Sequence, residues 1–364
     1  MGYSIDTRTL RPGDIYIPVK GARFDGHDFS AEALRKGASK ILDVDLGQFA
    51  AEQRLKHNIP VLAVTGSSGK TTTKDLLAAT LGQKFNLIKS AENQNNEIGV
   101  PLTLLKITAQ TELAIVEMAM RGAGQIEYLA RLAKPTHAVI TNIGWTHIEL
   151  LGDRDNIAQA KAEVIQPNMT IFLNENDDYY AYLSKLAGER NAQVIGYKSA
   201  KILDINKAAA ISVAKHFGLT DEQIAAGLAQ YQPSPQRQKI IEHHGVTIID
   251  DTYNANPDAM NFALQVLRET PAARRIAVLG DMLELGNWAE KLHRQIDVTG
   301  LDLVYTYGKL SANIPQQEHF TDKAALVKKL KETLRQGDAV LVKGSRGLQM
   351  EIIIRELGIP GDQQ

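Results

Sequence analysis

Short apolar runs alternate with longer helical patterns along this sequence, and this alternation restricts the fold more than any other feature. The apolar runs lie at residues 60–66, 113–118, 137–143, 246–251, 275–281, 303–308 and 339–345. Helical patterns lie between them, for example at residues 75–82, 124–133, 206–217, 257–268 and 322–334. Strands that alternate with helices are typical of α/β domains built on parallel sheets. The sequence therefore predicts an α/β fold.

Two proline-containing stretches indicate domain boundaries. One ends at Pro60, directly before the first strong strand, and the other is YQPSPQRQ at residues 231–238. Stretches of this kind favour turns and linkers. We predict an N-terminal module over residues 1–58, a central nucleotide-binding domain over 59–231 and a C-terminal α/β domain over 232–364.

Composition argues against several classes of function. The 41 basic and 42 acidic residues give a formal net charge of −1, so no charge excess drives binding to nucleic acid. The absence of cysteine removes disulfides, thiolate metal sites and cysteine nucleophiles, and it fits a reducing compartment. No apolar run reaches the length of a membrane span. We expect a cytoplasmic protein with no nucleic-acid partner and no membrane insertion.

The segment VTGSSGKTTTKDLL at residues 64–77 predicts a phosphate-binding loop. It places a glycine-rich turn between a strand and a helix, where backbone N–H groups and the helix N-terminus attract anions. Lys70 would reach the outer phosphates of a nucleotide, and the Thr71 hydroxyl would bind Mg²⁺. The loop is a short form, because Gly66 precedes Lys70 by four residues and Val64 stands where the commonest form has a glycine. The alternative is a Gly-Ser turn that only caps a helix.

Polar side chains also follow two other apolar runs. Glu117 lies at the end of the run at 113–118, and the carboxyl ends of parallel strands are where α/β sheets bind ligands. It is a candidate Mg²⁺ ligand, with a surface pair to Arg121 as the alternative. His147 follows the run at 137–143, although a lone histidine is usually structural. Lys161 lies in a helical pattern, and from the sequence alone it is interpreted as a surface charge.

Two further groups of polar residues remain open from the residues alone. Asn93, Asn95 and Asn96 precede an Ile-Gly-Val-Pro turn, and asparagines favour solvated turns. Near the C-terminus, the last apolar run ends in a cation, a hydroxyl and a second cation, a set suited to a carboxylate or a phosphate. These three residues are Lys343, Ser345 and Arg346.

Several motifs together resemble the Mur ligase superfamily, and most closely its D-alanyl-D-alanine-adding, MurF-type ligases. TGSSGKTT resembles the superfamily's nucleotide loop, whereas NQNNEIGVPLTLL at 93–105 and DTYNANP at 251–257 resemble segments of the D-alanyl-D-alanine adders. The resemblance implies three domains, with a central phosphate-loop parallel-sheet domain and a Rossmann-like C-terminal domain. It also implies ATP-dependent joining of D-alanyl-D-alanine to UDP-N-acetylmuramoyl-tripeptide through an acyl phosphate, in peptidoglycan precursor synthesis.

The resemblance further implies roles for individual residues. The ATP-binding residues would be Gly66, Ser67, Ser68, Gly69, Lys70, Thr71, Thr72, Asn206, Arg237 and Asp251. The catalytic residues would be Lys70, Glu117, His147 and Lys161. Mg²⁺ would be held by Thr71, Glu117, His147 and a carbamylated Lys161. The substrates would be bound by Asp6, Thr7, Arg8, Asn93, Asn95, Asn96, Arg121, Tyr253, Asn254, Asn256, Lys343, Ser345 and Arg346.

Other interpretations of the same motifs stay open from the sequence. One is a sister ligase that adds a single amino acid or glutamate, and another is a shortened, non-catalytic nucleotide-binding relative. A plain phosphate-loop NTPase or kinase is a third. We expect a monomer under the preferred interpretation.

Overall fold

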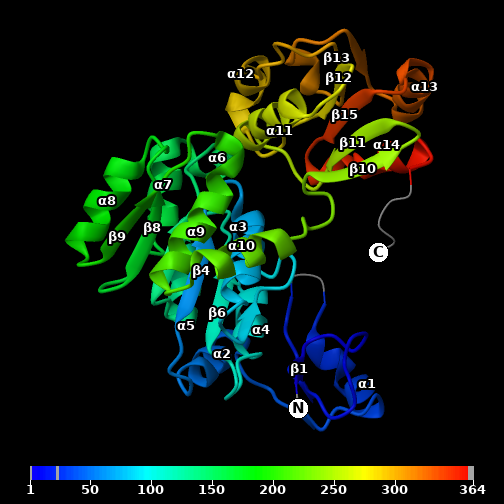
Figure 1. Cartoon of the computed structure of the whole chain (residues 1–364). Coiled ribbons are helices and arrows are strands. Elements are labelled where there is room, and N and C mark those ends of the chain that lie inside the picture. The colour runs from blue at the N-terminus through cyan, green and yellow to red at the C-terminus, as the bar shows by residue number, and fades with distance from the viewer. Residues whose placement is uncertain (1, 22–23, 360–364) are drawn as a thin grey trace.

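The strands of this protein form three separate sheets in the computed structural model, which describes residues 2–21 and 24–359 (Figure 1). The other positions, 1, 22–23 and 360–364, belong to the predicted first and third parts and lie outside the described residues. Each of the seven predicted apolar runs contains a strand, and the predicted α/β class is confirmed. No helix in the described ranges is long and apolar enough to cross a membrane.

The N-terminal module is built on a small parallel sheet. Its strands lie in the order β1 (Tyr3–Ser4), β2 (Ile15–Tyr16) and β3 (Lys40–Ile41). Between β2 and β3 the chain forms the 3₁₀ turn η1 (Gly26–Phe29) and helix α1 (Ser30–Arg35). Each strand has only two residues, so few backbone groups pair, and this module has the smallest sheet of the three.

Helix α2 (Leu46–Arg54) packs on the central domain, although the sequence assigned it to the first module. A Cβ atom at Gly47 would overlap the hydroxyl of Tyr128 on the central domain. Nε of Arg54 donates to the carbonyl of Ala133 at 3.2 Å. Helix α2 therefore contacts the central domain, and the division at residue 58 stays a prediction.

The central sheet is entirely parallel and has the order β5 (Leu87–Lys89), β6 (Leu113–Glu117), β4 (Val61–Thr65), β7 (His137–Ile140), β8 (Thr170–Asn174) and β9 (Gln193–Tyr197). After β4 the chain adds β5 and β6 toward one edge of the sheet. It then adds β7, β8 and β9 toward the other edge. This change of direction makes the carboxyl end of β4 the switch point, where open α/β sheets bind ligands.

Alternate side chains of the central strands enter two different cores. On β4, Leu62 and Val64 pack against the helices of one face, whereas Val61 and Ala63 pack on the other. The first face is covered by α3 (Lys70–Leu81), α9 (Ile205–His216) and α10 (Asp221–Gln230). The second is covered by α2, α4 (Gly99–Leu104), α5 (Gln125–Ala133), α7 (Arg154–Ala162) and α8 (Tyr180–Glu189). Both faces are buried, as parallel sheets require.

Helix α3 begins at Lys70, five residues before the helix predicted from the sequence. The first turn contains three threonines, whose branched side chains lower helix propensity and mislead a reading based on pattern. Thr71 and Thr73 are nevertheless buried in the folded chain. Tertiary packing therefore extends the helix back to the phosphate loop.

The third sheet has the order β10 (Lys239–His243), β11 (Val246–Asp251), β15 (Asp338–Lys343), β12 (Arg274–Gly280), β13 (Leu303–Tyr307) and β14 (Glu318–Phe320). All neighbours are parallel except β10 and β11, which form a hairpin that the sequence reading did not predict. Its turn has positive φ at His244 and Gly245, 49° and 75°, as a tight hairpin turn requires.

Helices cover both faces of the third sheet, as in a Rossmann-like domain. One face packs on α11 (Pro257–Glu269) and α12 (Ala289–Arg294), the other on α13 (Lys323–Thr333) and α14 (Glu351–Glu356). Figure 1 shows this domain and the N-terminal module at opposite ends of the central domain. The third domain meets the central one where η3 (Gly286–Trp288) contacts α6 (Ile148–Leu151).

Candidate active site

A cavity of about 1920 Å³ lies between the central and third domains. Its walls include the loop after β4, the ends of β6 and β7, and the segment between β11 and α11. The predicted site residues that line it are Ser67, Ser68, Gly69, Lys70, Thr71, Thr72, Asn93, Asn95, Asn96, Glu117, Arg121, His147, Asn206, Arg237, Asp251, Tyr253, Asn254, Asn256, Lys343, Ser345 and Arg346. Most of the predicted residues thus lie around one space.

The glycine-rich loop adopts a backbone that larger residues could not. Gly66 has a φ of 144° and a Cβ there would overlap the Thr141 hydroxyl, while Gly69 has a φ of 76°. The N–H groups of Ser67 and Ser68 are held by Asn142, at 3.0 Å by its carbonyl and at 2.8 Å by its side chain. Among the described residues, no side chain caps α3, so the N–H groups of its first turn face the cavity edge as an anion site requires.

The side chain of Lys70 folds back and contacts the backbone of this loop. Its Nζ atom donates to the carbonyl of Gly66 at 2.8 Å and to that of Ser67 at 3.4 Å. Burial lowers the pKa of Lys70, and the nearby charge of Arg237 adds to this effect while Glu117 opposes it. A negative ligand in the loop would therefore stabilise the charged form of this lysine.

Glu117 lies directly beside the first turn of α3 and is almost completely buried. Its Oε2 atom accepts from the Thr71 hydroxyl at 2.9 Å, and its Oε1 atom accepts from Nδ2 of Asn95 at 2.8 Å. The ammonium of Lys74, which the sequence reading missed, lies 3.7 Å from Oε2 and is also buried. A hydroxyl and a carboxylate side by side are the hard oxygen donors that Mg²⁺ prefers, so Thr71 and Glu117 fit this ion.

Lys161 is buried on α7, contrary to the surface position that its sequence context indicated. Burial, together with the charge of Lys70, holds its pKa well below the usual value. Within residues 2–21 and 24–359, its ammonium has no hydrogen-bond or ion-pair partner. A buried lysine without a counterion is stable only as the neutral amine.

His147 lies at the interface with the third domain. Its Nδ1 atom is 2.7 Å from Oε2 of Glu284, and this contact lowers the pKa of the Glu284 carboxyl. Both residues have positive φ, 64° and 63°, which is uncommon for side chains of this kind. In the described part of the chain, no three His, Asp or Glu side chains gather closely enough to form a metal centre by themselves.

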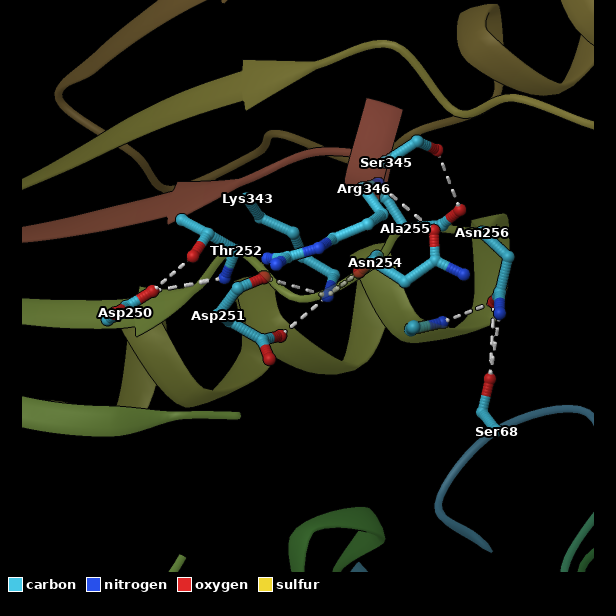
Figure 2. Close-up of polar contacts among 11 residues, drawn as sticks. Ser68, Asp250, Asp251, Thr252, Asn254, Ala255, Asn256, Lys343, Ser345 and Arg346 are labelled. Atoms are coloured by element: carbon cyan, nitrogen blue, oxygen red, sulfur yellow. Dashed lines mark hydrogen bonds and ion pairs between the residues drawn. The ribbon is translucent and has the colours of Figure 1, made fainter. Parts of the chain in front are cut away.

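The segment between β11 and α11 is organised by a buried lysine (Figure 2). Nζ of Lys343 contacts Oδ2 of Asp251 at 2.6 Å and donates to the carbonyl of Asn254 at 2.8 Å. The Ser345 hydroxyl donates to the carbonyl of Ala255 at 3.3 Å. The polar atoms of Lys343 and Ser345 are therefore engaged inside the third domain, and both residues also line the cavity.

The two predicted arginines of the third domain lie near one aromatic ring. The guanidinium carbon of Arg237 is 3.8 Å from the centre of the Tyr253 ring, and that of Arg346 is 6.0 Å from it. Arg346 also donates to the side chain of Gln236 at 2.6 Å. Stacking on the ring holds both cations at the cavity wall, and Arg346 also forms an ion pair with Glu351 at 3.5 Å.

Asp6, Thr7 and Arg8 lie apart from this cavity. Arg8 pairs with Asp6 at 2.6 Å on the surface, and the Thr7 hydroxyl donates to Glu32 at 3.0 Å. The cavity lining begins at Ser67, so no described residue of the first module contributes to it. A ligand that contacts both regions must therefore be long.

The structure also adds cavity residues that the sequence reading missed. Asn174 ends β8, Asn176 and Asp177 follow it, and Arg154 begins α7. Oδ2 of Asp177 accepts from the N–H of Ile143 at 2.8 Å, which ties the end of β8 to the loop after β7. The sequence TIFLNENDD at residues 170–178, which was not among the predicted apolar runs, was a signal for these residues, because polar side chains at strand ends form ligand sites in such sheets.

A phosphate loop at the switch point of a parallel sheet, facing a second α/β domain across a cavity, defines a nucleotide-binding protein of three parts. Family models for the Mur ligase catalytic domain, the Mur ligase middle domain and the Mur ligase glutamate ligase domain match residues 1–94, 64–224 and 236–346. The chain belongs to the Mur ligase family.

Individual relatives and solved structures agree with this assignment. The chain is 34% identical to the UDP-N-acetylmuramoyl-tripeptide–D-alanyl-D-alanine ligase of Bacillus subtilis, over 98% of this chain and 93% of the relative. It is 36% identical to the protein of the same name from Synechocystis, with 97% and 90% covered. MurF of Acinetobacter baumannii has a TM-score of 0.88 at 27% identity, with 98% and 92% covered. MurF of Thermotoga maritima in complex with ADP has a TM-score of 0.86 at 29% identity, with 98% and 96% covered.

Proposed function

We propose that this protein is an ATP-dependent ligase that joins D-alanyl-D-alanine to UDP-N-acetylmuramoyl-tripeptide and releases ADP and phosphate. The product, UDP-N-acetylmuramoyl-pentapeptide, is a peptidoglycan precursor, so the activity serves cell-wall synthesis and with it cell shape and division. Relatives named for this reaction match nearly the whole chain at 34% and 36% identity. The proposal includes a cytoplasmic location and a monomeric state.

The observation that carries the proposal is that one cavity is lined both by the phosphate loop and by the DTYNANP segment. The loop is suited to a nucleotide triphosphate, whereas the second segment belongs to a separate domain that can bring another substrate. Asp6, Thr7 and Arg8 lie outside the cavity, which suits a long substrate whose uridine end reaches the first module.

The chemistry requires activation, because a carboxylate does not react with an amine at neutral pH. Transfer of the γ-phosphoryl group of ATP to the tripeptide carboxylate forms an acyl phosphate and releases ADP. The amine of the dipeptide then attacks the carbonyl carbon, phosphate leaves with the C–O bonding pair, and the amine loses a proton. Lys70 would turn from the carbonyl of Gly66 to the outer phosphates and offset their charge.

Thr71 and Glu117 are the residues that would hold Mg²⁺, since they place two oxygen donors 2.9 Å apart at the loop. When bound, Mg²⁺ supplies positive charge against the transferring phosphate. His147 would contribute Nε2, because its Nδ1 atom faces Glu284, and a carboxylate behind a histidine is a common support for metal binding.

We also propose that Lys161 is carbamylated. The lowered pKa favours the neutral amine, and the neutral amine is the form that attacks CO₂. An N–C bond forms, one proton is released, and the side chain becomes an anion that compensates the nearby charge of Lys70 and can assist in metal binding.

The test is turnover of the purified protein with ATP, Mg²⁺, D-alanyl-D-alanine and UDP-N-acetylmuramoyl-tripeptide, followed by phosphate release and mass spectrometry of the product. Parallel assays with lysine-containing and diaminopimelate-containing tripeptides identify the third residue. Lys70→Ala should lower the rate by at least about a hundredfold, because it removes charge stabilisation at the transferring phosphate.

Three other outcomes would support the rival functions. Turnover with a single amino acid but not with the dipeptide would indicate a sister ligase. No phosphate release with all four components present would indicate a non-catalytic binding protein. ATP hydrolysis that does not depend on the dipeptide would indicate a plain NTPase.

A further inference from the structure

Asn256 reaches from the third domain to the phosphate loop (Figure 2). Its Nδ2 atom lies 3.1 Å from the hydroxyl of Ser68 and 3.0 Å from that of Thr146, both in the central domain. Its Oδ1 atom accepts from the N–H of Ala259 at 2.9 Å and so caps helix α11 within its own domain. The Oδ1 atom also lies 3.2 Å from the Ser68 hydroxyl, so the amide caps its own helix and contacts the neighbouring domain through both of its polar atoms.

A second contact lies two residues further along the chain, in the first turn of α11. Oδ2 of Asp258 accepts from the N–H of Trp145 at 2.9 Å, and a Cβ atom at Gly144 would overlap this carboxylate. The N–H of Gly144 in turn donates to the Ser67 hydroxyl at 2.8 Å. The turn at residues 144–146 is therefore enclosed between the phosphate loop and the start of α11.

The partners of Asn256 are themselves part of the phosphate-loop structure. The Thr146 hydroxyl donates to the carbonyl of Ser67 at 3.1 Å, and the Thr141 hydroxyl donates to that of Ser68 at 2.6 Å. On the other side, Lys343 fixes the segment that presents Asn256. Both ends of the contact are thus held by hydrogen bonds, so the contact fixes the third domain relative to the loop.

We propose that Asn256 is a positioning residue that docks the third domain on the phosphate loop, and that it is not a contact for the incoming dipeptide. Docking brings Arg237 and Asp251 to the cavity that Lys70 and Thr71 line. The consequence for turnover rests on the proposed function, but the docking itself does not.

The experiment measures the position of the third domain directly. The chain has no cysteine, so Lys185→Cys on α8 and Lys331→Cys on α13, both exposed, take spin labels at defined sites. Electron–electron double resonance then gives the interdomain distance distribution. Asn256→Ser keeps a good helix cap but cannot span the gap, and Thr146→Val removes the hydroxyl at constant size. Thr146→Ser, which keeps the hydroxyl, is the matched control.

We expect Asn256→Ser and Thr146→Val to broaden the distance distribution and to lower kcat/KM about tenfold, without a comparable rise in the KM for the dipeptide alone. The double variant should be less impaired than the product of the two single effects, because both changes remove the contact between Asn256 and Thr146. Thr146→Ser should resemble the parent. A thermal unfolding transition, measured for each labelled variant, establishes that the variant is folded under the conditions of the distance measurement.

Two results would overturn the inference. One is an unchanged distance distribution in folded Asn256→Ser and Thr146→Val proteins. The other is an effect confined to the KM for D-alanyl-D-alanine, which would make Asn256 a substrate contact. If the parent does not ligate at all but the distances still change, the docking inference stands and the proposed function fails.

Discussion

Lys343→Met tests how the buried ion pair organises the third domain. The side chains of Lys343 and Asp251 are 3% and 10% exposed, and the ammonium contacts the carboxylate at 2.6 Å. Methionine fills nearly the same volume but leaves the Asp251 carboxylate buried without its cation. Breaking a buried pair in this way costs about 3–5 kcal/mol, whereas replacing both partners costs much less. We therefore expect Lys343→Met to lower the free energy of unfolding of the third domain by about 3 kcal/mol or more.

Urea unfolding followed by circular dichroism and tryptophan fluorescence measures this change. The double variant Asp251→Asn with Lys343→Met is the control, because it also removes the unpaired charge of the Asp251 carboxylate. We expect it to recover more than half of the lost free energy of unfolding. A loss below about 1 kcal/mol for the single variant would refute the reasoning, since a solvated surface pair has this value. A double variant as unstable as the single one would show that the charge is not the cause.

Three further predictions concern the loop and two titrating groups. Gly66→Ala should abolish nucleotide binding in calorimetry, because its Cβ would overlap the Thr141 hydroxyl; ADP affinity equal to that of the parent would contradict this. Burial, with a contribution from His216, lowers the pKa of His137 to about 4, so the unfolded chain binds more protons between pH 4 and 6.5 and stability should fall as the pH falls through this window. His137→Phe should flatten that dependence in urea titrations. Native mass spectrometry in bicarbonate should show one added CO₂ that disappears in Lys161→Met, and a parent mass that does not change would contradict carbamylation.

The sequence was sufficient for the elements whose signal is local. The apolar runs predicted most of the interior strands, because residues buried on both faces are apolar throughout, although the interior strand β8 was missed. The loop at residues 64–77 was recognised because its chemistry depends on glycines and a lysine at fixed spacing. Edge strands such as β5, β10 and β14 were not among the predicted strands, since they are short or half exposed and lack a continuous apolar run.

Lys161, Lys343 and Asn256 show what the sequence left undecided. A lysine on a helix or at a strand end has the same local signature whether it faces solvent or a buried carboxylate. Lys161 and Lys343 are buried because distant elements close over them, and Asn256 contacts Ser68, 188 residues away in the chain.

By itself, the sequence determined the α/β class, the phosphate loop and the set of polar residues available for chemistry, since these follow from residue type and short-range spacing. Only the tertiary structure decided which of those groups are buried away from solvent, and which neighbouring groups balance their charge or satisfy their hydrogen bonds. Burial and electrostatic pairing depend on contacts between segments far apart in the chain, and the local sequence pattern does not predict those contacts.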